Sequence, residues 1–214
     1  MIAAATKAEI GPTLDWLRSF EEDDPIHDRI GVCITGVGLM AATYALTCSL
    51  TFPSVKCVIG AGIGGAYDKS LSLGECVVIQ SEQLADLGAE DGEAFIDLFD
   101  MGFADRNVIP FTNGKLVNPL EKLPFSIAHL KQKTGLTVLT ASGRESTIAQ
   151  RLERYGADVE SMEGAALHYV CGRLGLPFIQ LRAISNYVTR RDRSAWRIGD
   201  AVDGLNAQLL EWLK

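Results

Sequence analysis

The chain has 214 residues, a formal net charge of -7 at pH 7 and a pI near 5.0. A chain of this size can bury a core without disulfides, and its excess of acid argues against a nucleic-acid surface, which needs clustered Lys and Arg. No apolar run reaches the length of a membrane span, and the first residues lack the basic segment of a signal peptide. We therefore expect one domain over residues 1–214, located in the cytoplasm, with a small soluble ligand.

The cysteines and histidines give no signal of a disulfide frame or a metal site. The five cysteines contain no C-x-x-C pair, and the three histidines share no metal-ligand spacing. Scattered cysteines of this kind are typical of small core residues. We expect no metal and no other cofactor.

The first part of the chain alternates between strand and helix patterns. The expected strands are 1–5, 30–35 and 55–59, and the expected helices are 7–20 and 39–50. Glu9 falls at the first junction between strand and helix, where a carboxylate can serve either as a partner of the helix dipole or as a functional group.

Two glycine-rich turns follow the second and third of these strands. Gly36-Val37-Gly38 lies between a strand and a helix, as a dinucleotide-binding turn does, but the next strand ends in Gly60 where an acid should hold the ribose. The second cluster, 60–65, is followed too soon by another strand, 75–79, to leave room for a phosphate-binding helix. We therefore disfavour a nicotinamide-cofactor enzyme and expect these strand-end glycines to let a ligand approach backbone amides.

The second half begins with polar loops and ends in clear alternation of strand and helix. Residues 80–105 and 107–124 are expected to be loops, and the first is long enough for a lid, a binding loop or an oligomer contact. The expected helices are 125–133, 144–155 and 199–214, and the expected strands include 136–140 and 178–181. This order predicts a three-layer α/β sandwich around a mostly parallel, mixed central sheet.

The segment from Val159 to Asn186 carries polar residues that an ordinary core element does not need. Glu160 and Glu163 stand where an apolar run gives way to a helical pattern, and the following strand ends in Arg182, Ser185 and Asn186. In parallel units ligands bind outside the carboxyl ends of the strands. We expect the site there.

Six motifs in this order resemble the purine nucleoside phosphorylase/nucleosidase superfamily over nearly the whole chain. Within it the chain is similar to the methylthioadenosine/S-adenosylhomocysteine nucleosidases and the futalosine hydrolases. The motifs are Glu9, Thr35-Gly36-Val37-Gly38, Gly62-Ile63-Gly64-Gly65, Ala141-Ser142-Gly143, Ser161-Met162-Glu163-Gly164-Ala165 and Arg182-Ala183-Ile184-Ser185-Asn186. The resemblance implies a nucleoside phosphorylase-like domain that acts as a homo-oligomer.

The resemblance also implies roles for single residues. Glu163 would grip the ribose 2′- and 3′-hydroxyls, Met162 would pack on the sugar, Glu9 would hold the attacking water, and Asn186 would meet the purine at N7. Breaking an N-glycosidic bond passes through an oxocarbenium-like sugar, which carboxylates and a positioned water suit. The further substrate-binding candidates are Gly62, Ile63, Gly64, Ser142 and Ser161.

Asn186 departs from the adenine-specific nucleosidases, which resemble this chain but have aspartate there. Asparagine cannot protonate N7, while its amide offers the donor and acceptor that suit a 6-oxopurine. This predicts hydrolysis of futalosine to hypoxanthine and dehypoxanthine futalosine, in menaquinone biosynthesis. Methylthioadenosine/S-adenosylhomocysteine nucleosidase activity is the alternative.

A basic loop with aromatic residues follows Asn186. Arg190 or Arg191 could pair with a substrate carboxylate while Tyr187 or Trp196 covers an aryl ring, although a solvated basic loop explains the same residues. This loop resembles the corresponding segment of futalosine hydrolases.

Two other functions remain open. A phosphorylase would use phosphate instead of water and needs arginines near the glycine turns, where 36–39 and 60–67 contain no Arg or Lys. A nucleoside-binding protein without catalysis could keep Glu163 but would have no need of Glu9.

Overall fold

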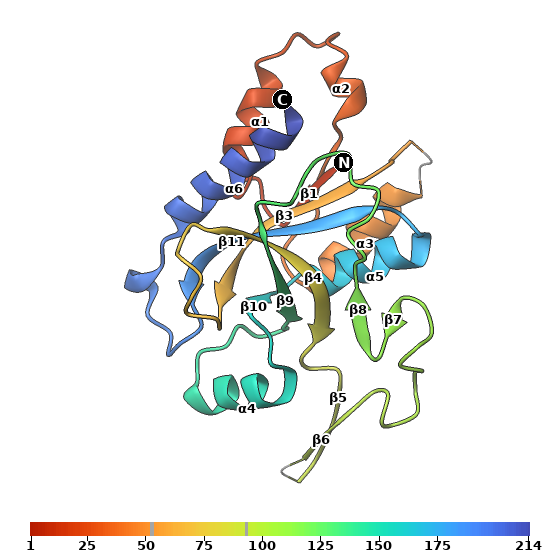
Figure 1. Cartoon of the computed structure of the whole chain (residues 1–214), viewed down its shortest axis with the longest axis vertical. Helices are drawn as coiled ribbons and strands as arrows, with labels where there is room; N and C mark the ends of the chain where they lie inside the picture. Colours follow the sequence, from red (N-terminus) through yellow and green to blue (C-terminus); the bar gives the residue numbers. More distant parts are fainter. Residues whose placement is uncertain (52–53, 93) are drawn as a thin grey trace.

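The computed structural model describes residues 1–51, 54–92 and 94–214 (Figure 1). Its first part contains β1 (Ile2–Ala4), α1 (Gly11–Arg18), α2 (Ile26–Arg29), β2 (Val32–Ile34), α3 (Leu39–Leu50), β3 (Val58–Ala66) and β4 (Cys76–Leu84). Two short antiparallel pairs follow, β5 (Gly88–Asp91) with β6 (Ala94–Asp97) and β7 (Phe111–Thr112) with β8 (Lys115–Val117). The remainder is β9 (Lys131–Thr137), α4 (Glu145–Tyr155), β10 (Val159–Ser161), α5 (Gly164–Leu174), β11 (Phe178–Tyr187), the 3₁₀ turn η1 (Arg193–Ala195) and α6 (Ile198–Leu213).

The central sheet is mixed, and part of it closes on itself. β3 and β11 run parallel along their length, and β11 also pairs antiparallel with β4. β4 pairs with β9, β9 with β10 and β10 with β3, so these five strands form a ring. β1 and β2 extend the sheet beside β3, and β8 and β7 extend it beside β4. Closure gives each ring strand a partner on both sides.

Helices cover the sheet on two sides (Figure 1). α1 and α6 pack together on one side, where Ile59, Leu181 and Leu205 are buried in a common core. α3 and α5 pack on the other side, with Leu46 and Leu167 between them and the sheet. These four helices bury apolar side chains in cores shared with the strands, and the expected α/β sandwich is confirmed.

We expect the glycines of residues 60–65 to follow the end of a strand, but the structure places them inside β3. A Cβ at Gly62 would lie 2.6 Å from Arg182 Nη1, and one at Gly65 would lie 2.9 Å from Val188 Cγ2. The missing side chains leave room for Arg182 of β11 and for Val188, which directly follows β11, to cross the middle of the strand.

The expected helix 125–133 is wrong, because β9 begins at Lys131 and turns precede it. β9 pairs with β4 on one side and β10 on the other, and this double pairing overrides the local helical pattern. The expected loop 107–124 contains the β7–β8 hairpin. Asn113 and Gly114 form its turn with φ of 50° and 75°, a hairpin signal that the sequence carried.

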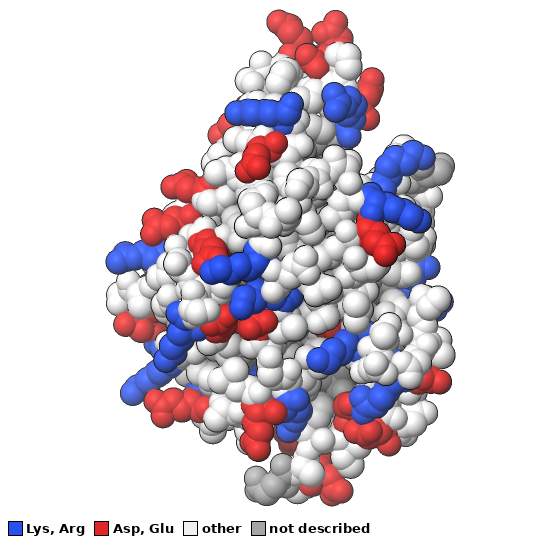
Figure 2. Space-filling view, viewed as in Figure 1, with Lys and Arg blue, Asp and Glu red and all other residues white. Residues whose placement is uncertain are grey.

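Surface charge and helix length were used above to argue against a nucleic-acid surface and a membrane span. Acidic and basic side chains are interspersed over the face shown in Figure 2. Within the described ranges, none of the helices combines the length and apolarity needed to cross a bilayer.

Candidate active site

A cleft of about 340 Å³ opens where β1, β3, β10 and β11 come together. Most of the predicted site residues line it, namely Glu9, Ile63, Gly64, Ser142, Ser161, Met162, Glu163, Asn186 and Trp196. Residues far apart in the sequence therefore meet in one place. Gly62 lies in a smaller recess that shares Glu9 and Glu163 with the cleft.

Glu9 is held in the turn between β1 and α1, because α1 begins only at Gly11. Its Oε2 accepts hydrogen bonds from the backbone N–H of Thr6 at 2.9 Å and from the Thr6 hydroxyl at 3.0 Å. Its Oε1 accepts a longer bond, 3.3 Å, from the N–H of Ile63. The Asn206 side chain of α6 donates to the backbone oxygen of Glu9 at 2.9 Å. The carboxylate is thus fixed at the floor of the cleft, with Oε1 still able to accept from a ligand.

Glu163 is the N-cap residue of α5, but its carboxylate turns away from that helix. Oε1 accepts a hydrogen bond of 2.8 Å from the backbone N–H of Gly38. Gly38 has φ of 92°, a conformation that side-chain-bearing residues rarely adopt. The turn at 36–38 therefore holds a carboxylate of the cleft, which explains a glycine pattern that only resembled a dinucleotide-binding loop.

Asn186 follows an irregularity of β11 between Ile184 and Asn186. Its Oδ1 accepts from the Ser185 hydroxyl at 2.8 Å, and its Nδ2 donates to the Tyr187 carbonyl at 3.1 Å. Because the Tyr187 carbonyl can only accept, the second bond fixes which end of the amide carries the donor. One N–H and one lone pair remain for a ligand.

Glu160 lines the cleft, but its carboxylate is engaged by the protein. It accepts from the backbone N–H of Ser142 at 2.8 Å, from the Ser142 hydroxyl and from the Tyr67 hydroxyl, and Arg151 Nη1 lies 3.5 Å away. Burial and the bond to Glu160 raise the pKa of Tyr67, so its hydroxyl stays a donor. Ser142 is thus placed at the cleft, as expected, with both of its polar groups already hydrogen-bonded to Glu160.

Ser161 lies on the strand before Met162 and Glu163 and is buried against the cleft. Within the part of the chain that the structure describes, its hydroxyl has no hydrogen-bond partner. A buried hydroxyl without a partner costs free energy, so this one is available to a ligand.

Arg182, which the sequence marks as a polar residue of its strand without a defined role, is also part of the site. Its side chain is only 4% exposed, and its Nη1 approaches the same point beside Gly62 as Glu9 Oε1 does. It lines the smaller recess with Glu9 and Glu163. The signal was present, since an arginine within a strand of apolar residues needs a polar partner.

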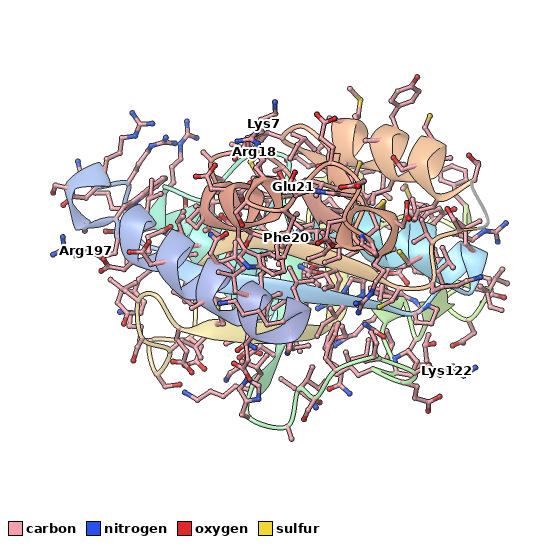
Figure 3. The ribbon with its side chains drawn as sticks, turned by 90° about the horizontal axis from the view of Figure 1, so that it is seen from above. Lys7, Arg18, Phe20, Glu21, Lys122 and Arg197 are labelled. Carbon is pink, nitrogen blue, oxygen red and sulfur yellow. The ribbon has the colours of Figure 1, made fainter. Side chains whose placement is uncertain are left out.

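The basic loop reaches the cleft through Val188 and Trp196. Trp196 lines the cleft, and the Arg191 guanidinium lies 5.6 Å from the centre of its ring. Arg190 and Arg191 are both exposed, and neither lines the cleft. Arg197 points away from the body of the protein before α6 (Figure 3). Across the described ranges there is no group of three His, Cys, Asp or Glu that could hold a metal ion.

The fold and the cleft define an α/β protein with paired carboxylates and an amide converging on one ligand-sized space. A family model described as the phosphorylase superfamily matches residues 27–208, and the chain belongs to that superfamily. It is 36% identical over 149 residues to a futalosine hydrolase of Streptomyces coelicolor, covering 69% of this chain and 61% of that relative. It is 32% identical over 177 residues to a futalosine hydrolase of Thermus thermophilus, covering 80% of this chain and 75% of the relative.

The fold has close counterparts among solved structures. The 5′-methylthioadenosine/S-adenosylhomocysteine nucleosidase of Neisseria meningitidis, in complex with methylthio-immucillin-A, superposes with a TM-score of 0.75. The match covers 100% of this chain and 97% of that one at 17% identity. At this identity the likeness establishes the shared fold.

Proposed function

We propose that the protein is an N-glycosidase that hydrolyses a 6-oxopurine nucleoside, and that its substrate is futalosine. The products would be hypoxanthine and dehypoxanthine futalosine. The observation that carries this proposal is the convergence of Glu9, Glu163 and Asn186 on one cleft. The similarity to two futalosine hydrolases over most of the chain supports the same substrate.

The two carboxylates suit different parts of the reaction. Glu163, fixed by Gly38, would bind the ribose hydroxyls from one side of the cleft. Glu9, fixed by Thr6 and Ile63, would take a proton from the attacking water. The C–N bond breaks as positive charge develops on the sugar, and the nearby carboxylates stabilise that charge. Met162 would pack on the sugar between them.

Asn186 would recognise the base. Its free N–H can donate to N7 of a 6-oxopurine, and the departing base keeps its charge on the ring and the oxygen. The amide has no acidic proton to transfer. Adenine leaves readily only when N7 is protonated, so an adenine nucleoside would be a poor substrate. Asn186 would therefore favour hypoxanthine over adenine as the leaving base.

Trp196 and Arg191 would form the subsite for the group at the 5′ position. The indole ring can cover an aryl group, and the guanidinium beside it can pair with a carboxylate. Arg191→Ala should then raise KM for futalosine more than KM for inosine, because Arg191 lies over the Trp196 ring. Arg190→Ala, at the neighbouring exposed position, is the control and should affect both little. Equal effects of Arg191→Ala on the two substrates would argue against the subsite.

The decisive assay compares two substrates in one preparation. Release of hypoxanthine from futalosine and of adenine from methylthioadenosine is measured by chromatography, with and without phosphate. We expect faster hypoxanthine release that does not depend on phosphate. Faster adenine release would support methylthioadenosine/S-adenosylhomocysteine nucleosidase activity in its place.

A phosphorylase on the same fold is the second candidate, and Arg182 is the observation that favours it. A buried guanidinium beside Glu9 could neutralise a phosphate as well as orient a water. Turnover that requires phosphate and yields a sugar phosphate would establish this alternative. Tight nucleoside binding without release of any base would indicate a binding protein.

We further propose that the protein works as a homo-oligomer in the cytoplasm, in menaquinone biosynthesis. α3 contains no charged residue, and Val37, Met40 and Tyr44 at its start and outer face are 59%, 85% and 75% exposed. Val37 also lines the cleft, so this apolar face is continuous with the site. A second copy of the chain would cover it. Sedimentation velocity of the protein and of Met40→Glu tests this, and a monomeric wild type would refute it.

A further inference from the structure

A group of buried polar side chains lies behind the cleft, under the first turn of α5. Glu82 of β4 is 0% exposed, and Thr137 of β9 and Gln180 of β11 are 1% exposed. None of the three lines the cleft. Polar side chains at such depth need a structural or functional reason, because burying them costs free energy.

The three side chains form one hydrogen-bonded chain that ends on the backbone of α5. Gln180 Nε2 donates to Glu82 Oε2 at 2.9 Å, and the Thr137 hydroxyl donates to Glu82 Oε1 at 3.1 Å. Thr137 Oγ1 in turn accepts from the backbone N–H of Ala165 at 2.8 Å. Glu82 therefore fixes the direction of the Thr137 hydroxyl, and Thr137 fixes the second residue of the helix.

The N-cap position of α5 explains why such an arrangement is needed. The first N–H groups of a helix have no partner within the helix and are usually capped by the side chain of the N-cap residue. Here the N-cap residue is Glu163, whose carboxylate bonds Gly38 and makes no side-chain capping bond among the described residues. Thr137 supplies the missing acceptor from a neighbouring strand. The Glu163 carboxylate is thereby left for the cleft.

The packing around Glu82 leaves no freedom for this turn to move toward the sheet. A methyl group at Gly164, the residue after Glu163, would overlap the Glu82 carboxylate, and one at Gly135 would overlap it from β9. The carboxylate is therefore in contact with the backbone of both elements. It sets the distance between the start of α5 and β9.

We infer that Glu82 and Thr137 are positioning residues that hold Glu163 in place for the ribose hydroxyls. They touch no substrate. They act by capping and seating the turn that carries Glu163, and the inference rests on the proposed nucleosidase function.

The test is a double-mutant cycle on futalosine hydrolysis. Thr137→Val removes the bridging hydroxyl with little change in volume, and Thr137→Ser keeps it. Thr134→Val is the matched control, because Thr134 lies on the same strand and bonds the Asp158 carboxylate at 2.9 Å, away from α5. These three changes and Glu82→Gln are each made singly in the wild type and in the Glu163→Asp background, and kcat and KM are measured for every variant. Thermal melting confirms that the variants fold.

We expect Thr137→Val to lower kcat/KM about tenfold or more, since small displacements of a positioning group are costly. Glu82→Gln should lower kcat/KM less, because the new amide keeps one oxygen that can accept from either Thr137 or Gln180. Thr137→Ser and Thr134→Val should stay within about twofold of wild type. In Glu163→Asp, where the carboxylate is already displaced, Thr137→Val and Glu82→Gln should each cost no more than about twofold.

Two outcomes would overturn the inference. One contradicts only the positioning role, and the other contradicts the proposed function as well. Equal losses from Thr137→Val in both backgrounds, with an active wild type, would show that Thr137 does not act through Glu163. A wild type that releases no base from futalosine, methylthioadenosine or inosine would overturn the proposed function and this inference with it. If Thr137→Val does not fold, Glu82→Gln in the two backgrounds gives the same comparison.

Discussion

The carboxylate of Glu163 accepts a hydrogen bond from the backbone N–H of Gly38 at 2.8 Å, across two turns that are 125 positions apart in the chain. The bond joins the loop before α3 to the start of α5. It depends on a glycine, because Gly38 has φ of 92° and ψ of 163°. That region of backbone conformation is almost closed to other residues.

Gly38→Ala should therefore lower both stability and activity. We expect a loss of about 1–3 kcal/mol in the free energy of unfolding, measured in urea, because alanine is strained at this φ and ψ. We also expect a lower kcat/KM for futalosine, since the Gly38 N–H would move away from Glu163. Gly31→Ala is the control, because Gly31 has no positive φ and a methyl group there meets open space. Equal effects of the two changes would contradict this role of Gly38.

The sequence predicted the fold better than it predicted the interior of the sheet. The helices 39–50, 144–155 and 199–214 were within a residue of the observed bounds, because their apolar spacing and glycine boundaries are local signals. The ring of strands was not predictable in this way, since β3 has glycines where a strand pattern needs side chains. Its pairing with β11 is decided by how closely the two strands pack, which is not a local property.

The candidate site shows the same division. Glu9, Glu163 and Asn186 stand at element boundaries, where polar residues are visible against apolar runs, and the structure brings all three to one cleft. The sequence marks Arg182 as polar without a role and predicts a loop over 80–105, where Glu82 in fact belongs to β4. Both acquire their importance from side chains that approach from distant parts of the chain. Distance in the sequence concealed both.

Glu9→Gln should separate binding from turnover. The amide keeps the size of the side chain and can still accept from Thr6, but it cannot take a proton from water, so kcat should fall about a hundred- to ten-thousand-fold. Affinity for futalosine, measured by calorimetry under conditions of negligible turnover, should change little. Glu21→Gln, in the exposed turn after α1, should leave kcat unchanged. Retained turnover in Glu9→Gln would exclude Glu9 as the general base.

Asn186→Asp should shift the preference from hypoxanthine toward adenine. The new carboxyl oxygen would face the Tyr187 carbonyl, which the Asn186 amide now contacts as a donor at 3.1 Å. Two acceptors repel there, so the protonated carboxyl is favoured, and unlike the amide it holds an acidic proton that rotation of the carboxyl can present to N7. We expect the ratio of kcat/KM for methylthioadenosine to that for futalosine to rise about tenfold or more, in line with the contribution of a general acid. An unchanged ratio would show that this position does not select the base.

The buried Glu82 should make stability depend on pH between the ordinary glutamate range and neutrality. Burial raises the pKa of Glu82 to about 7, although the Gln180 and Thr137 hydrogen bonds and the charge of Arg182 oppose this. In the unfolded chain the group ionises near its ordinary pKa of about 4.3. The folded protein therefore keeps a proton that the unfolded chain releases, and the contribution of Glu82 to stability falls as pH rises through this window.

The neighbours of Glu82 can accommodate both protonation states. Burial lowers the pKa of His168 to about 3, so this ring is neutral, and its Nδ1 lies 3.0 Å from the Leu116 carbonyl. Among the described residues, Gln180 Oε1 and His168 Nε2 have no hydrogen-bond partner while Glu82 accepts from Gln180 Nε2. When Glu82 is protonated, a turn of the Gln180 amide lets Oε1 accept from Glu82 and Nε2 donate to His168. The protonated form is then fully hydrogen-bonded, which favours it at low pH.

Glu82→Gln should remove this pH dependence. Urea unfolding from pH 4.5 to 8 should show the stability of the wild type falling relative to the variant by up to about 3 kcal/mol as pH rises to 7, then staying level. Thr137→Ser, which leaves the carboxyl in place, should keep the wild-type slope. Parallel curves for the wild type and Glu82→Gln would show that Glu82 is ionised throughout this range, with the positive charge of Arg182 outweighing its burial.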